Sequence, residues 1–177
     1  MKYSNYFAIT ILCALASSAS ADSEAMPTPK VFAAPWNSFY FKLIPSPDFD
    51  EGKSQGFLYR VTDGEDELLY RSDGWFSFNV LVSIDGSFIA RRGPWPRSDS
   101  PPETTPAVVF YVDGTLVRTY YVSDLVDKKS ALQRSISHYS WGDVLRWADE
   151  EGAGILQIRT VEDKIIKFNI RTAEIVD

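Results

Sequence analysis

The chain has 177 residues, of which 24 are acidic and 18 basic, and its formal net charge is −6 at pH 7. This acidic balance argues against nucleic acids and anionic membrane surfaces as partners, because both attract clusters of lysine and arginine. Aromatic residues make up 14 % of the sequence, a share that favours β-strands over disorder.

Residues 1–21 have the pattern of a secretory signal peptide. One lysine precedes the apolar run AITILCALA, and the small residues SSASA follow it. We therefore expect cleavage after Ala21 and a periplasmic or extracellular protein. The apolar run is too short for a stable membrane span, although an uncleaved anchor is the alternative. The single cysteine, Cys13, lies in this segment, so the exported chain would have no thiol for a disulfide or a metal.

The exported part divides into a linker and one β-rich domain. Residues 22–35 contain three prolines among small residues, which predicts a loosely attached N-terminal linker. Residues 36–177 form the predicted domain. Its first strand is expected at residues 36–44, and a hairpin follows at residues 57–62 and 67–71.

Residues 78–92, FNVLVSIDGSFIARR, predict a β-hairpin at the centre of the domain. Asp85-Gly86 joins two apolar runs, and Asp-Gly in this setting favours a two-residue type I′ turn. This turn would place Val82 opposite Ile89. Both faces of the hairpin would then be largely apolar, so we expect it to be covered on both sides.

Residues 93–106, GPWPRSDSPPETTP, interrupt the strand pattern with five prolines, which cannot donate to a sheet ladder. A loop of this length without regular structure is either functional or mobile. Another hairpin is expected after it, at residues 107–122, with its turn at Asp113-Gly114.

The last third of the chain mixes one helical segment with further strands. We predict a short helix at residues 123–133, with Ser123 as its N-cap, and a strand at residues 134–141. Residues 142–154 fit either a helix or a strand, and a strand is favoured because the neighbouring segments are strands. A final hairpin is expected at residues 155–170.

Together these elements predict an all-β fold. It would be an antiparallel meander of β-hairpins, arranged as blade-like sheets or a small sandwich, with one short helix. The stretch VSIDGSFIA resembles the hairpins that recur in β-propeller blades, and YVDGTLVRTYYVSDL and VEDKIIKFNIRTAEIV are similar. The chain is too short for four four-stranded blades, so the resemblance implies two or three blade-like sheets packed together. The chain also resembles uncharacterised exported bacterial proteins, which implies no activity.

Basic and aromatic side chains around the proline-rich loop form the predicted binding site. Arginine forks bind carboxylates and other anions at two points, and a tryptophan between two prolines presents a flat ring to a sugar or a partner side chain. The alternative is structural: arginines paired with the domain's own acids, a hydrogen-bonded histidine and tryptophans in the core. The predicted site comprises Arg92, Trp95, Arg97, Arg134, His138 and Trp141.

We expect an exported, non-enzymatic binding or interaction module of the bacterial envelope. Its partner would be an envelope or extracellular protein, or a glycan. We predict no catalytic residue, metal or cofactor, since the chain has one histidine and an exported form without cysteine. Two alternatives stay open. One is a small periplasmic hydrolase with His138 as its base, and the other is a structural envelope subunit whose sheet edges pair with another chain.

Overall fold

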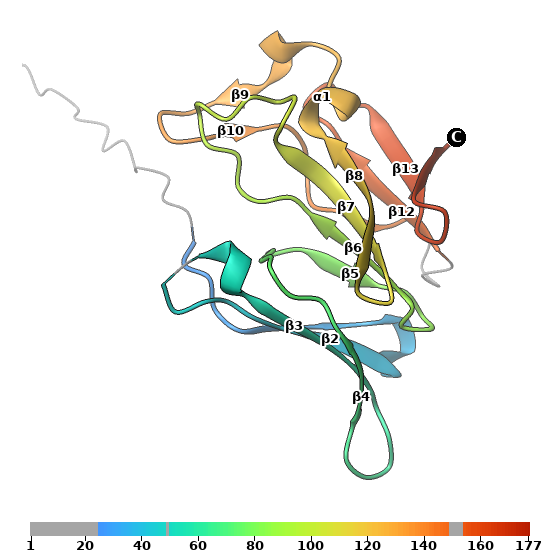
Figure 1. Cartoon of the computed structure of the whole chain (residues 1–177). Helices are drawn as coiled ribbons and strands as arrows, with labels where there is room; N and C mark the ends of the chain where they lie inside the picture. The colour runs from blue at the N-terminus through green and yellow to red at the C-terminus, as the bar shows by residue number, and fades with distance from the viewer. Residues whose placement is uncertain (1–24, 49, 149–153) are drawn as a thin grey trace, which may run out of the picture.

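The computed structural model describes residues 25–48, 50–148 and 154–177, so the predicted signal peptide lies outside the described residues. Within them, three four-stranded antiparallel sheets follow one another along the chain, and a two-stranded hairpin lies between the second and the third (Figure 1). In each four-stranded sheet the strands pair in chain order. This meander of hairpins confirms the predicted all-β fold class.

The first sheet corrects the start of the predicted domain. Its strands are β1 (Lys30–Ala33), β2 (Phe39–Ile44), β3 (Gln55–Arg60) and β4 (Glu67–Arg71). β1 pairs with β2, so the end of the predicted linker at residues 22–35 belongs to the sheet. β2 begins at Phe39 because Trp36 and Asn37 have positive φ angles, 65° and 59°, which lie outside the β region.

The second sheet is central, and its register agrees with the prediction. Its strands are β5 (Val80–Val82), β6 (Phe88–Arg92), β7 (Pro106–Val112) and β8 (Thr115–Tyr121). Val82 lies opposite Ile89, as expected for the hairpin at residues 78–92. β7 and β8 form the second expected hairpin.

The two Asp-Gly turns of this sheet differ. At Asp113-Gly114 both φ angles are positive, 47° and 79°, as a type I′ turn requires. In the β5–β6 turn only Gly86 has a positive φ, and its amide donates to the carbonyl of Ser83 (3.0 Å). The predicted type I′ turn at Asp85-Gly86 is therefore wrong, because the loop contains additional residues that leave Asp85 in an ordinary conformation.

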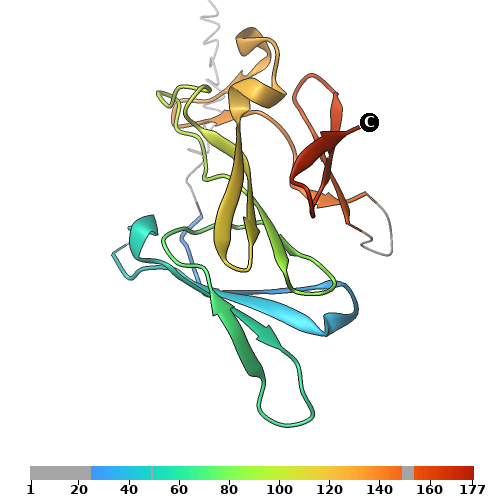
Figure 2. The same cartoon turned by 45° about the vertical axis from the view of Figure 1, so that its right-hand side comes forward.

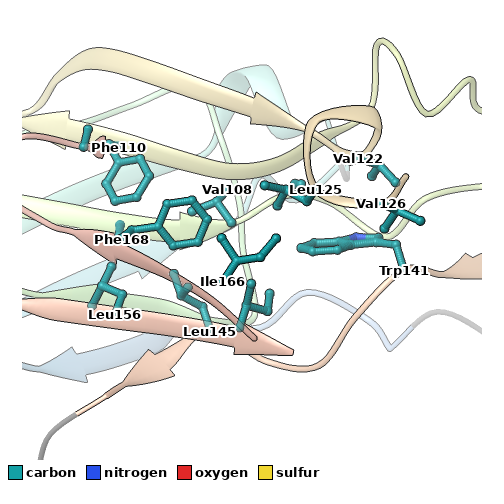
Figure 3. Close-up of a cluster of buried hydrophobic side chains, with 14 of the residues drawn as sticks. Val108, Phe110, Val122, Leu125, Val126, Trp141, Leu145, Leu156, Ile166 and Phe168 are labelled. Carbon is teal, nitrogen blue, oxygen red and sulfur yellow. The ribbon is translucent and has the colours of Figure 1, made fainter. Parts of the chain in front are cut away.

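Separate hydrophobic clusters cover the two faces of the central sheet, as predicted for the hairpin. Figure 2 shows this sheet between the other two. One cluster joins it to the first sheet, and the other joins it to the third sheet and to the helix (Figure 3). The cluster toward the first sheet includes Phe41, Leu43, Leu58, Trp75, Val80, Val82, Ile89 and Tyr111. The cluster toward the third sheet includes Ala90, Val108, Phe110, Leu125, Trp141, Leu156, Ile166 and Phe168.

Part of the ambiguous stretch at residues 142–154 forms the first strand of the third sheet. Its strands are β11 (Arg146–Trp147), β12 (Ile155–Arg159), β13 (Ile165–Asn169) and β14 (Glu174–Val176). β11 pairs with β12, and an antiparallel bridge between Gly142 and Thr160 lies beside this pair. Residues 149–153 of the stretch lie outside the described residues.

The helical segment is shorter than predicted. α1 (Val122–Leu125) forms a single turn, and a separate 3₁₀ turn follows at Lys129–Ala131. Ser123 is not the N-cap; Tyr121 precedes the helix, and its amide donates to the carboxylate of Asp124 (2.7 Å). In the described ranges no helix has the length and apolar character needed to cross a bilayer.

The predicted strand at residues 134–141 is a hairpin instead. β9 (Gln133–Arg134) and β10 (Tyr139–Ser140) pair with each other, and the chain reverses between them. Ile136, in the loop, is 97 % exposed. A continuous strand is stabilised by burying its apolar side chains, and Ile136, the apolar residue between β9 and β10, is not buried.

Candidate functional site

Backbone hydrogen bonds hold the proline-rich loop against the β9–β10 hairpin. The amide of Tyr139 donates to the carbonyl of Pro96 (3.1 Å). Arg97 and His138 face each other as an isolated antiparallel bridge. The loop that follows β6 therefore lies beside a hairpin that comes much later in the sequence.

A surface groove of about 420 Å³ lies beside this contact, which is within the size range of small-ligand sites. Three of the predicted binding residues line it: Arg92, Trp95 and His138. A second cavity of about 240 Å³ shares Arg92, Trp95 and Val144 with the groove, so the two adjoin. The remaining residues of the groove wall are Pro96, Tyr139, Ser140, Gly142, Asp143 and Arg146.

Arg92 is a partly buried cation at the boundary of the two cavities. Its Nη2 donates to the carbonyl of Gly142 (2.9 Å), and the guanidinium lies 4.8 Å from the ring centre of Trp141. Its Nε is buried without a hydrogen-bond partner. Burial lowers the pKa of Arg92 from its ordinary value, and the charge of Asp143 opposes this shift. A partly desolvated guanidinium that lines two cavities is suited to bind an anion.

Trp95 and His138 form an aromatic contact at the edge of the groove. Their ring centres are 4.5 Å apart, and both side chains are partly exposed. The Nδ1 atom of His138 lies 2.8 Å from Ser135 Oγ and 3.2 Å from Ser137 Oγ. The hydrogen bonds to Nδ1 fix the orientation of the imidazole, which in turn supports the tryptophan ring.

Two of the predicted arginines hold the loop and the hairpin together and lie outside the groove wall. Arg134 Nη1 donates to the carbonyl of Ser98 (2.9 Å), and its guanidinium lies 5.3 Å from the ring centre of Tyr139. Arg97 is exposed, and its backbone forms the bridge to His138. Neither side chain belongs to the wall of the groove in the part of the chain that the structure describes.

Trp141 is a core residue rather than a ligand contact. It is fully buried in the cluster between the second and third sheets, at one end of the side chains drawn in Figure 3. Its indole Nε1 has no hydrogen-bond partner. The predicted binding role of Trp141 is therefore corrected to a supporting one, because the ring lies beneath the guanidinium of Arg92.

The groove also contains two charged residues and one apolar residue outside the predicted set. Asp143, Val144 and Arg146 come from the stretch whose secondary structure was ambiguous. Phe78, which lines the second cavity, lies two residues before β5, at the start of the segment in which a covered hairpin was predicted. The one available signal was the alternation of charged and apolar residues around β11, which does not indicate a site by itself.

The sequence also contains the G-x-S-x-G pattern of a nucleophile elbow, at Gly52-Lys53-Ser54-Gln55-Gly56. A nucleophile elbow lies between a strand and a helix and exposes its serine. Here Ser54 lies between a 3₁₀ turn and β3, is buried, and accepts a hydrogen bond from the amide of Ser46 (3.3 Å). This serine is therefore structural.

Neither metal ligands nor relatives identify the site. Among the described residues, no group of three or more His, Cys, Asp or Glu side chains could hold a metal ion. A comparison of the chain with known protein families and with curated proteins finds no match.

Proposed function

We propose that this protein is an exported, non-enzymatic binding module of the bacterial envelope, and that its ligand binds in the groove beside Trp95. The observation that carries the proposal is Arg92. Its side chain lines both cavities, and within the described residues its guanidinium donates to one carbonyl, that of Gly142, and forms no salt bridge. A partly desolvated arginine without a salt bridge at the junction of two cavities favours an anionic ligand.

Export is proposed from the sequence of residues 1–21, with its lysine, apolar run and small residues. An envelope or extracellular protein, or a glycan, is then the source of the ligand. The groove is rigid enough for such a role, because backbone hydrogen bonds join both of its sides to the sheets. A preorganised site loses little entropy on binding.

A hydrolase with His138 as its base is the second candidate. The distance of 2.8 Å between Ser135 Oγ and His138 Nδ1 favours it, since this is the separation expected for a nucleophile and its base. However, the described groove wall contains His138 but neither Ser135 nor Ser137. A substrate in the groove would therefore meet the imidazole and not the hydroxyl groups of Ser135 and Ser137 that contact it, so a binding role is favoured.

The proposal is tested by affinity capture from the envelope fraction of the source organism. Immobilised wild-type protein should retain a ligand that Trp95→Ala does not, while Ile136→Ala, at an exposed position outside the groove, should retain it fully. Both variants should melt within about 3 °C of the wild type, because neither side chain is in the buried clusters. Equal capture by Trp95→Ala, or a drop of many degrees in its melting temperature, would contradict the proposal.

The hydrolase alternative has its own test. In a broad ester and peptide screen, the wild type should show only background hydrolysis. His138→Ala should give the same background rate. A wild-type activity that this substitution abolishes would replace the binding role with an enzymatic one.

A further inference from the structure

We propose that the groove and the adjoining cavity form one site for a carboxylate that carries a neighbouring aromatic or branched apolar group. This inference rests on the proposed binding function and names its ligand class. The cavities share Arg92, Trp95 and Val144. A ligand that fills both must therefore join its charged and its apolar parts by a few bonds.

The groove supplies the anion-binding part of the site. Arg92 and Arg146 bring two guanidinium groups to its wall, and Asp143 brings one carboxylate. Apart from His138, these groups leave one net positive charge, in a protein whose overall charge is −6. A single positive charge matches a monovalent carboxylate better than a doubly charged phosphate, and an arginine fork matches the planar carboxylate geometry.

The second cavity supplies the apolar part. Arg92 is the only charged residue of its described wall, and the aromatic rings of Phe76, Phe78 and Trp95 line it together with Pro94. Phe76 and Phe78 pack edge to face, with ring centres 5.0 Å apart. Phe78 remains 39 % exposed. A large apolar side chain left in contact with water at a cavity wall is stabilised when an apolar group covers it.

A ligand that is charged throughout or apolar throughout would match only one of the two parts of this site. A purely apolar ligand would leave the desolvated Arg92 without an anion, and a small inorganic anion would leave the aromatic wall uncovered. The aromatic wall and the guanidinium groups lie on adjoining surfaces. The geometry therefore favours an aryl or branched-alkyl carboxylate.

The test uses isothermal titration calorimetry of the mature chain with three probes. N-acetyl-L-phenylalanine has both groups, N-acetyl-L-phenylalanine amide lacks the carboxylate, and N-acetylglycine lacks the apolar group. We expect N-acetyl-L-phenylalanine to bind at least about tenfold more tightly than either of the others, because each lacks one charge-assisted or apolar contribution. Equal affinities for the acid and its amide, or no binding of any probe, would overturn the inference.

Two substitutions separate the parts of the site. Arg146→Gln removes a charge from the groove alone, and Phe78→Ala removes a ring from the apolar cavity alone. Each should weaken N-acetyl-L-phenylalanine binding about fivefold or more, whereas the matched surface controls Arg118→Gln and Leu116→Ala on β8 should not change it. Unchanged binding by either site variant would contradict a shared site.

Failure of this inference is distinguishable from failure of the proposed function. If the probes do not bind but capture from the envelope fraction still depends on Trp95, the ligand class is wrong and the binding role stands. If that capture is also independent of Trp95, the groove is not the binding site.

Discussion

Arg91 and Arg92 are neighbours on β6, and they show how differently the two faces of the central sheet are used. Both guanidinium groups lie over a tryptophan ring, Arg91 at 4.9 Å from the centre of Trp75 and Arg92 at 4.8 Å from the centre of Trp141. Successive side chains on a strand point to opposite faces. Arg91 therefore enters the contact with the first sheet, and Arg92 enters the contact with the third.

The surroundings of the two arginines decide their roles. Arg91 is only 8 % exposed, and its Nε donates to the hydroxyl of Tyr111 (3.0 Å) inside a stack of aromatic rings. Its Nη1, like the Nε of Arg92, is buried without a hydrogen-bond partner. Burial raises the pKa of Tyr111, although Arg91 opposes that shift, so the phenol stays neutral. Arg92 instead lines both cavities. The same residue type is thus enclosed by a core on one face and lines a cavity on the other, where we propose that it binds a ligand.

The largest effects are expected for the two tryptophans beneath the arginines. Trp75→Ala and Trp141→Ala should each lower the free energy of unfolding by about 3–5 kcal/mol, measured by urea denaturation, because both rings are buried. Phenylalanine variants sharpen the comparison. Trp75 Nε1 donates to Ser72 Oγ (3.0 Å), whereas Trp141 Nε1 has no partner, so Trp75→Phe should destabilise more than Trp141→Phe. The opposite order would contradict this account of the two faces.

An intermediate effect is expected when each arginine is replaced by methionine. Arg91→Met should lower the free energy of unfolding by about 1 kcal/mol, because the hydroxyl of Tyr111 loses its partner, and it should not change binding of N-acetyl-L-phenylalanine. Arg92→Met should lower stability by a similar amount, since each arginine makes one hydrogen bond and has one unpaired buried nitrogen, but it should weaken binding at least about tenfold. Calorimetry and urea denaturation of both variants check the contrast, which fails if the two variants lose binding equally.

The smallest effect concerns Asp85, which links the central hairpin to the third sheet through Arg171 (3.3 Å). Burial raises the pKa of the Asp85 carboxyl, but hydrogen bonds from Ser83 and Ser87 and the charge of Arg171 outweigh it, so the pKa is lowered overall. A lowered pKa means that the ionised carboxyl stabilises the fold above about pH 4 and that this contribution is lost as the pH falls.

Asp85→Asn should therefore destabilise the protein at pH 7 by less than about 1 kcal/mol, since this carboxyl is more than one-third exposed and solvent screens it. The difference from the wild type should vanish near pH 2. Urea denaturation at the two pH values measures it. A difference that persists at pH 2 would assign the effect to packing rather than to charge.

The sheets were predictable from the sequence because hairpin signals are local. Alternating apolar residues and Asp-Gly pairs predicted the β5–β6 register and the β7–β8 turn. β1 was missed, since its four residues lie among prolines and form a strand through pairing with β2. The reversal between β9 and β10 was missed for a similar reason: the loop after β6 supplies the partner, and no local pattern indicates that pairing.

The site was predictable only in part. Of the residues selected by the clustering of basic and aromatic side chains, Arg92, Trp95 and His138 line one groove, and their binding role stays a prediction. It also selected Trp141, because composition does not reveal which rings the third sheet covers. Arg146 was missed because it reaches the groove through β11, whose position depends on pairing with β12. Long-range pairing therefore limits what can be inferred about the site from the sequence.

The most direct test of the difference between the two faces is a side-chain NMR titration of ¹⁵N-labelled protein with N-acetyl-L-phenylalanine. The indole N–H signal of Trp95 and the Nε–H signal of Arg92 should shift, because both residues line the proposed site. The corresponding signals of Trp75 and Arg91 should stay in place, because the aromatic stack encloses them. Equal shifts on both faces, or no shift at Trp95 and Arg92, would contradict a ligand site on the Arg92 face.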